Sequence, residues 1–204
     1  MERPEVHPPH ARHGGLPKWL ELVIAVTALI TSISSIAIAV HHGKIMEKLV
    51  QANSLPFMQG GFSDITPEGV RIISLDLLNR GVGPAHQQSL RVKVDGQHVR
   101  SLNEMIRASL GPEQTAAAQG VLEPMHNRVR TRFISGNDIQ RVFRIPRTPE
   151  NAQYWDQLED FQPKWELEFC YCSVFKECWE VLGKWAEPAP VKACVRDEAR
   201  EFLP

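Results

Sequence analysis

The longest apolar run of the chain lies near its N-terminus. Residues 22–40 read LVIAVTALITSISSIAIAV, and none of these nineteen positions is charged. As an α-helix the run would rise about 28 Å, at about 1.5 Å per residue, which is close to the roughly 30 Å hydrocarbon core of a bilayer. Trp19 stands at one edge, where membrane helices often carry an interfacial aromatic residue. The pattern therefore predicts a transmembrane helix from Leu22 to Val40.

The helical pattern extends beyond the apolar run on its C-terminal side. Apolar residues recur at helical spacing as far as Val50, and the next proline is Pro56. We therefore expect a single helix over residues 18–52, in which the membrane span continues into a juxtamembrane segment. Residues 1–17 are rich in proline, glycine and histidine and are expected to form a disordered tail.

Two other interpretations of the apolar run stay open. It could be a buried core helix, or a cleaved signal peptide, since Ala37, Ile38 and Ala39 form an AxA pattern. If the run spans a membrane, the flanking lysines and arginines decide its orientation. Three precede it and two follow within twenty residues, namely Arg3, Arg12 and Lys18 before it and Lys44 and Lys48 after it. This small excess favours a cytoplasmic N-terminus and a C-terminal part outside the cytoplasm.

A stripe of small side chains follows one face of the predicted span. Thr27, Thr31, Ser35 and Ala39 recur at every fourth position, a spacing that lets a second helix approach closely. The stripe indicates packing against a second copy or another membrane protein. The alternative is that the hydroxyl groups bond to carbonyls of their own helix.

From residue 55 onwards the spacing of apolar residues changes to two, which is typical of β-strands with one buried face. Around residues 71–79, for example, Ile73, Leu75 and Leu77 face one way and Ser74 and Asp76 the other. Further strands are expected within residues 57–64, 89–99, 126–135, 139–146, 164–172 and 177–185, with a tight hairpin at Asp95–Gly96. Ser101 and Glu104 form a capping box that predicts a short helix over residues 101–109.

Short strands, few helices and regular turn signals predict a mainly β fold. We expect an Ig-like antiparallel β-sandwich with one or two short helices over residues 55–185. A C-terminal extension over residues 186–204 follows it.

Three stretches are distinctive enough to compare with known families. They are IMEKLVQANSLPFMQ after the membrane helix, ISLDLLNRGVGPA with its NxGxGPA pattern, and CYCSVFKECW. Together they resemble a family of uncharacterised bacterial single-pass membrane proteins, over most of residues 19–182. The resemblance implies a β domain tethered to the bacterial inner membrane, and it implies no activity or cofactor.

The four cysteines all lie between residues 170 and 194. Alternation along residues 164–172 places Trp165, Leu167, Phe169 and Tyr171 on a core face and Glu166, Glu168, Cys170 and Cys172 on the other. A hairpin turn at Val174 and Phe175 would bring Cys172 opposite Cys178, within disulfide range.

We therefore expect a Cys172–Cys178 disulfide, with Cys170–Cys194 as a second pair. Three alternatives stay open. The cysteines could be reduced and structural, they could form a catalytic redox site, or all four, Cys170, Cys172, Cys178 and Cys194, could bind a metal. The spacing CxCx5Cx15C lacks the paired CxxC knuckles of most structural zinc sites.

Charge is balanced over the whole chain, with 23 basic and 24 acidic residues and a net charge of −1. Partners that bind through charge must therefore meet a local patch. The candidate is a basic face made of Arg128, Arg130, Arg132, Arg141, Arg144 and Arg147. It could bind lipid headgroups, phosphate or an acidic partner, or it could be a solvated sheet face neutralised by acidic neighbours. Nucleic acid is not expected, because Val129 and Thr131, which alternate with the first three arginines, cannot stack on bases.

Recognisable catalytic motifs are not found in the sequence. His86 and His98 each flank a strand singly and are expected to be surface residues. The sequence thus predicts a non-enzymatic, membrane-anchored interaction or accessory module without a cofactor, whose partners are lipid, a second copy or another membrane protein. A cysteine-based metal or redox protein at the membrane is the alternative function, and a cytoplasmic scaffold is a third.

Overall fold

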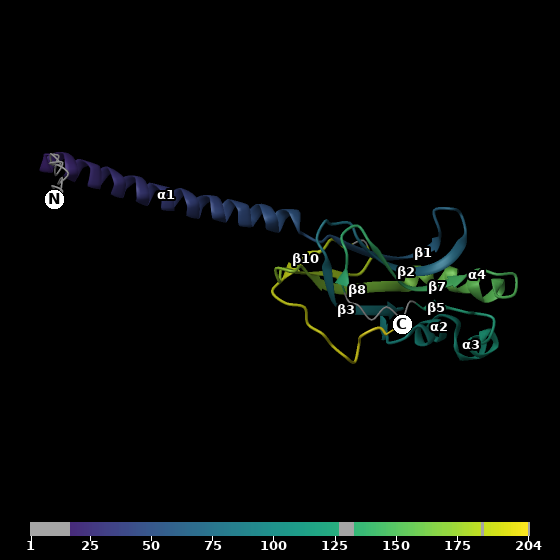
Figure 1. Ribbon diagram of the computed structural model, residues 1–204. Helices are drawn as coiled ribbons and strands as arrows, with labels where there is room; N and C mark the ends of the chain where they lie inside the picture. The colour runs from purple at the N-terminus through teal and green to yellow at the C-terminus, as the bar shows by residue number, and fades with distance from the viewer. Residues whose placement is uncertain (1–16, 127–132, 185, 204) are drawn as a thin grey trace, which may run out of the picture. The chain divides into compact units, whose positions relative to one another are not determined.

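The computed structural model describes residues 17–126, 133–184 and 186–203 and divides the chain at Leu49/Val50 into two compact units. The first consists mainly of helix α1, Lys18–Asn53, which matches the helix expected over residues 18–52 (Figure 1). No side chain of α1 is buried in the described part of the chain, although its apolar residues are numerous. By length and composition α1 could cross a membrane, and a signal sequence near an N-terminus would have the same properties.

The second unit contains two antiparallel sheets. The first sheet has the strand order β1-β2-β7-β5. Its strands are β1 (Met58–Ile65), β2 (Arg71–Asn79), β7 (Ile139–Pro146) and β5 (Met125–His126). The second sheet has the order β10-β9-β8-β3-β4, with β6 also paired to β3. Its strands are β10 (Ala189–Val191), β9 (Cys178–Leu182), β8 (Trp165–Cys172), β3 (Ala85–Val94), β4 (Gln97–Val99) and β6 (Phe133–Ile134).

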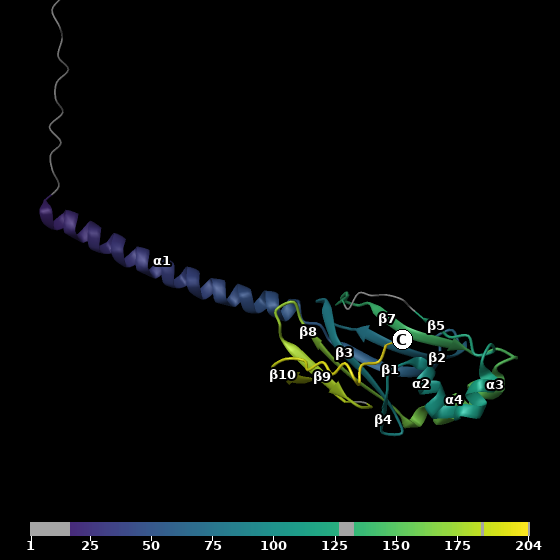
Figure 2. The ribbon, with the colours of Figure 1, turned by 90° about the horizontal axis from the view of Figure 1, so that it is seen from below.

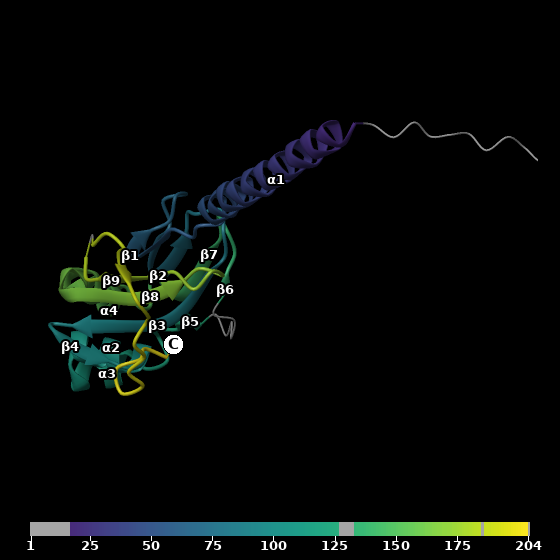
Figure 3. The ribbon, with the colours of Figure 1, turned by 90° about the vertical axis from the view of Figure 1, so that its left-hand side faces the viewer.

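The strands follow the alternation in the sequence. Ile73, Leu75 and Leu77 on β2 are fully buried, as their spacing predicts. Strands β3 and β4 are joined at Asp95 and Gly96, whose φ angles of 51° and 78° are those of a tight hairpin turn. Strands β9, β8 and β3 run side by side in Figures 2 and 3 and supply one wall of the core.

The two sheets share one hydrophobic core, and Gly60 marks a point where they come very close. A Cβ atom at Gly60 would lie 2.7 Å from Leu167 Cδ2 of β8 and 2.8 Å from Leu77 Cδ2 of β2. Because such distances are shorter than ordinary van der Waals contact, a side chain here would push β1 away from β8. Glycine at this position therefore allows the sheets to pack closely.

Three short α-helices gather at the end of this unit that lies away from β10 (Figures 1 and 2). They are α2 (Leu102–Leu110), α3 (Pro112–Ala118) and α4 (Ala152–Phe161), and a 3-10 turn, Gln162–Lys164, follows α4. The predicted capping of α2 is confirmed, since the Ser101 hydroxyl accepts a hydrogen bond from the Glu104 amide at 3.2 Å. The expected one or two helices are thus three. Helix α3 shows no apolar periodicity, and its start is marked only by a proline and a glutamate in its first turn.

The segment expected to be a C-terminal extension packs on the β domain. Residues 189–191 form β10, and Phe202 is buried with 2% of its surface exposed. The Phe202 amide donates to the carbonyl of Leu90 on β3, and the Leu203 amide donates to the carbonyl of Arg100. The last residues therefore lie along the edge of β3, between the positions where β6 and β4 pair with it.

Residues 79–85, which form the NxGxGPA pattern, bond to and pack against the segment through which the chain enters the β domain. Asn79 is fully buried, and its Oδ1 accepts hydrogen bonds from the amides of Phe57 and Gly81 at 3.2 and 3.0 Å. Its Nδ2 lies within hydrogen-bond distance of three carbonyl oxygens, those of Gly83 (2.7 Å), Ile134 (3.1 Å) and Ser135 (3.1 Å). At Gly83 a Cβ atom would fall 1.7 Å from the carbonyl oxygen of Ser54, so only glycine allows the backbones to pass.

Candidate functional site

The cysteine hairpin forms in the predicted register. Cys172 lies opposite Cys178, Tyr171 opposite Trp179 and Phe169 opposite Val181. The rings of Tyr171 and Trp179 stack with centroids 5.5 Å apart. The aromatic face of β8 is core, as predicted, but the cysteine face is also largely covered, with Cys170 only 1% exposed.

All four sulfur atoms lie at disulfide distance in the two predicted pairs. The Sγ atoms are 2.07 Å apart in Cys172–Cys178 and 1.98 Å apart in Cys170–Cys194. The first pair joins β8 to β9 across the hairpin, and the second ties the C-terminal segment to β8. The two pairs are also close to each other, since Cys172 Sγ lies 3.7 Å from Cys194 Sγ.

A histidine lies beside the cysteines, and the sequence did not predict this proximity. His86 on β3 pairs directly with Cys172 on β8, so the two side chains share one face of the sheet. The His86 ring stacks on Phe133 with centroids 4.2 Å apart, and its Nδ1 lies 2.8 Å from Nε2 of the Gln88 side chain. Because β3 and β8 are far apart in the sequence, only their pairing in the sheet reveals this neighbour.

Ion pairs occupy the rest of the cysteine face. Glu168 is paired with both Arg91 and Lys93 of β3, and Arg91 donates to Glu180 of β9 at 2.7 Å. The nearby His98 was expected at the surface, yet burial lowers its pKa and its Nδ1 is buried without a hydrogen-bond partner in the described part of the chain. These charges join β3, β8 and β9 across one face.

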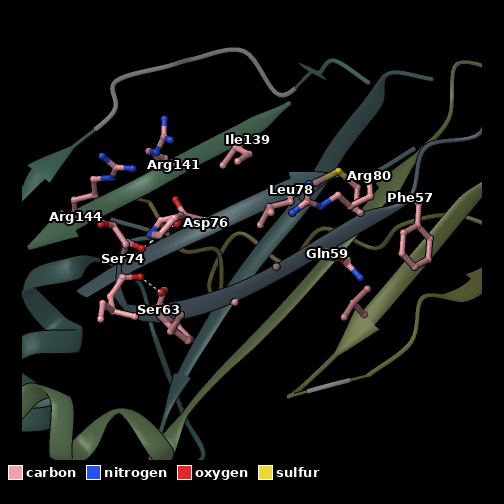
Figure 4. A pocket seen from close by; sticks show the side chains of 18 of the residues that line it. Phe57, Gln59, Ser63, Ser74, Asp76, Leu78, Arg80, Ile139, Arg141 and Arg144 are labelled. Carbon is pink, nitrogen blue, oxygen red and sulfur yellow. Dashed lines mark hydrogen bonds between the residues drawn. The ribbon is translucent and has the colours of Figure 1, made fainter. Parts of the chain in front are cut away.

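The basic face predicted from the sequence is only partly assembled. Arg128, Arg130 and Arg132 lie outside the described residues. Arg141 and Arg144 lie on one side of the sheet although they are three positions apart, because the β2–β7 register shifts between Leu75 and Asp76 and leaves Val142 unpaired. Figure 4 shows both arginines on the same side as Ser74 and Asp76.

Arg147 does not join the other two arginines. Its guanidinium forms a two-pronged pair with Asp156 of α4, at 2.8 and 2.9 Å. This pair raises the pKa of Arg147 and lowers that of Asp156. For Arg147, the interpretation as a residue neutralised by an acidic neighbour therefore holds.

A hollow of about 1050 Å³ runs along β1 and over the outer side of the first sheet (Figure 4). Its walls come from three strands, β1, β2 and β7, and from the end of β9 with the segment that follows it. The wall residues that argue for binding are Gln59, Gly61, Phe62, Leu78, Arg141 and Arg144. The groove thus combines apolar surface with three guanidinium groups, because Arg80 lines it as well.

Acidic groups partly balance Arg141 and Arg144. A hydrogen bond from Thr66 lowers the pKa of Glu68, and the positive charges of Arg141 and Arg144 lower it further. Asp76 accepts a hydrogen bond from Ser74 at 2.9 Å through Oδ2, while its Oδ1 is buried without a partner in the described residues. The groove is therefore polar but not strongly basic.

Strand β1 lies at the edge of its sheet, with β2 as its one neighbour among the described strands. The backbone groups of alternate residues point away from β2. One of these, the amide of Met58, bonds to the buried Tyr171 hydroxyl, whose pKa is raised by burial and lowered again by this bond. By the same alternation, Gly60 and Phe62 direct their amide and carbonyl groups away from β2.

The small-residue stripe on α1 has satisfied hydroxyl groups. Thr27, Thr31 and Ser35 each donate to helix carbonyls three or four positions earlier, at 2.7 to 3.0 Å. This is the bonding that the alternative interpretation of the stripe expects. Because the hydroxyl groups bond back to their own helix, the side chains of the stripe stay short, and a second helix could still approach them.

Comparison with known proteins finds no matching family model, no matching curated protein and no matching solved structure.

Proposed function

We propose that the chain is a single-pass protein of the bacterial inner membrane whose Ig-like domain lies outside the cytoplasm and binds a partner protein without catalysing a reaction. The observation that carries this proposal is the edge of β1, a strand whose residues 58–63 carry no charge and which borders an open groove. Separate observations support the membrane anchor α1, the Ig-like domain and the binding edge of β1.

The Ig-like assignment is supported by strand order. Immunoglobulin-type sandwiches place strands A, B, E and D in one sheet and C, F and G in the other. Here the first sheet runs β1-β2-β7-β5 and the second contains β9-β8-β3. With β1, β2, β3, β5, β7, β8 and β9 taken as A, B, C, D, E, F and G, the two orders agree.

The membrane location is supported by α1 and by the cysteines. A helix whose apolar side chains are all uncovered by protein needs another apolar environment, which a bilayer supplies. Disulfides persist outside the reducing cytoplasm, so two cysteine pairs at bonding distance favour an extracytoplasmic domain. The excess of basic residues before the span favours the same side.

The partner that fits the β1 edge is an extended segment of another protein, added to the sheet as a further strand. Natural sheets usually protect long edges with lysine, proline or a covering segment. Residues 58–63 contain no lysine or proline and include two glycines, so these six residues would present no charge and little steric hindrance to a new strand. Backbone bonds to Gly60 and Phe62 would supply affinity, and the groove would select side chains on the segment.

Site-specific photocrosslinking in intact cells tests this proposal. A benzoylphenylalanine at Gln59, which is exposed beside the edge, should give a defined adduct with one protein, and the same group at the exposed Glu113 of α3 should not. Gly61→Lys should abolish the adduct by adding a charge to the edge, and Gly61→Ser should preserve it, since a Cβ at Gly61 meets no atom within 4 Å.

Two outcomes of this experiment contradict the proposal. One is equal crosslinking from Gln59 and Glu113. The other is an adduct that survives Gly61→Lys unchanged, because binding would then not use the β1 edge. An adduct of the chain with itself would identify a second copy as the partner.

A further inference from the structure

Three of the four cysteine sulfur atoms form one compact group. The Sγ atoms of Cys172, Cys178 and Cys194 all lie within 4.8 Å of one another. This group combines members of both disulfides, because Cys172 is bonded to Cys178 and Cys194 to Cys170. Cys170 is not part of the group, although the sequence alone would count it as an equal ligand.

The separation between the two pairs matches that of thiolate ligands on a metal. Zinc binds thiolate sulfur at about 2.3 Å, so two sulfurs of a tetrahedral site lie about 3.8 Å apart. Cys172 Sγ and Cys194 Sγ are 3.7 Å apart without being bonded to each other. The backbone thus already holds two ligands at the required spacing, and the third, Cys178, needs only side-chain rotation once its bond to Cys172 is open.

The surroundings keep this spacing fixed. Cys172 and Cys178 sit on paired strands with Cα atoms 4.0 Å apart, and β10 pairs with β9 beside them. Cys194 lies three residues after the end of β10, so its position depends on that strand as well as on its disulfide. The three sulfurs would therefore stay near one another after reduction as long as the sheet remains folded.

We propose that reduction converts this cysteine face into a binding site for one thiophilic divalent cation of the zinc type. Its ligands are the thiolates of Cys172, Cys178 and Cys194, with water in the fourth position, and Cys170 is not a ligand. Reduction takes two molecules of a dithiol reductant, each of which gives up two electrons and two protons and leaves as a disulfide. The four cysteines thereby become thiols, and the cation then displaces the protons of three of them.

This inference does not depend on the proposed partner binding. The β1 edge belongs to the other sheet, so crosslinking from Gln59 can fail while metal binding holds, and the reverse is equally possible.

Cadmium titration of the full-length chain in detergent tests the proposal. After reduction with a phosphine under anaerobic conditions, Cd²⁺ should bind at one ion per chain and produce the ultraviolet charge-transfer band of cadmium thiolates. Cys194→Ser should lower the affinity by about tenfold or more and reduce the band by about a third, because one of three ligands is lost. Cys170→Ser is the matched control and should leave affinity and band unchanged.

Several outcomes overturn the proposal. They are the absence of stoichiometric binding to the reduced chain, equal binding by the oxidised chain, and equal losses in Cys194→Ser and Cys170→Ser. Near-ultraviolet circular dichroism is recorded alongside, because an unfolded reduced chain would use all four cysteines alike. Metal binding by an unfolded reduced chain would also contradict the proposal, because the proposed site requires the folded sheet.

Discussion

Replacing Asn79 by alanine should destabilise the β domain more than most single substitutions. The buried amide of Asn79 contacts five backbone polar atoms, and its two N–H groups are shared among three carbonyls. This gives about four full hydrogen bonds, each contributing about 1 kcal/mol net, so Asn79→Ala should cost about 4 kcal/mol. For a domain of this size, that loss corresponds to a fall in Tm of about 8–16 °C.

The assay is thermal unfolding of the full-length chain in detergent, followed by near-ultraviolet circular dichroism of the buried tryptophans. Asn103→Ala on the exposed side of α2 is the matched control and should change stability by less than about 0.5 kcal/mol. Asn79→Asp keeps the volume and both acceptor bonds but turns a carboxylate oxygen toward carbonyl oxygens, so it should also be strongly destabilising. Equal melting temperatures for Asn79→Ala and Asn103→Ala would refute the role assigned to this amide.

Three further predictions concern the core and two titrating groups. Gly60→Ala should lower stability by about 1–3 kcal/mol through overpacking between the sheets, whereas Gly61→Ala should change it little, and equal denaturant midpoints would contradict this contrast. Arg147 lowers the pKa of Asp156, so their pair stabilises the fold above the pKa of the unfolded carboxyl and is lost as pH falls through the folded pKa. Asp156→Asn should therefore flatten the acid side of the stability–pH curve, and an unchanged curve would count against the pair. Burial lowers the pKa of His98, so stability should fall as pH drops through the unfolded and then the folded pKa, and His98→Gln should remove that step.

The parts of the fold that could be predicted are those set by local pattern. Alternation located the strands, and the capping residues located α2. The register of the cysteine hairpin also follows from its own residues, because only one alignment keeps Phe169 and Tyr171 on the core face while Cys172 meets Cys178. These features depend on neighbours within a few residues or across one turn.

What could not be predicted depends on segments that meet only in the folded chain. His86 beside Cys172 and Phe202 along β3 result from pairings across many residues. The irregular pairing of β2 with β7 aligns Arg141 with Arg144, and α4 draws Arg147 away to Asp156. None of these contacts leaves a periodic signal in the sequence. The arginines could therefore not be told apart, and the sequence predicted that they share one basic face.

The proposed location of the β domain and its choice of partner both depend on α1 holding the chain permanently in a membrane. Alkaline carbonate extraction of membranes from cells that produce the chain tests this anchoring most directly. If α1 spans the bilayer, the full-length chain should stay in the membrane pellet. Release of the full-length chain into the supernatant, or recovery of only a shortened chain that lacks residues 22–40, would contradict it.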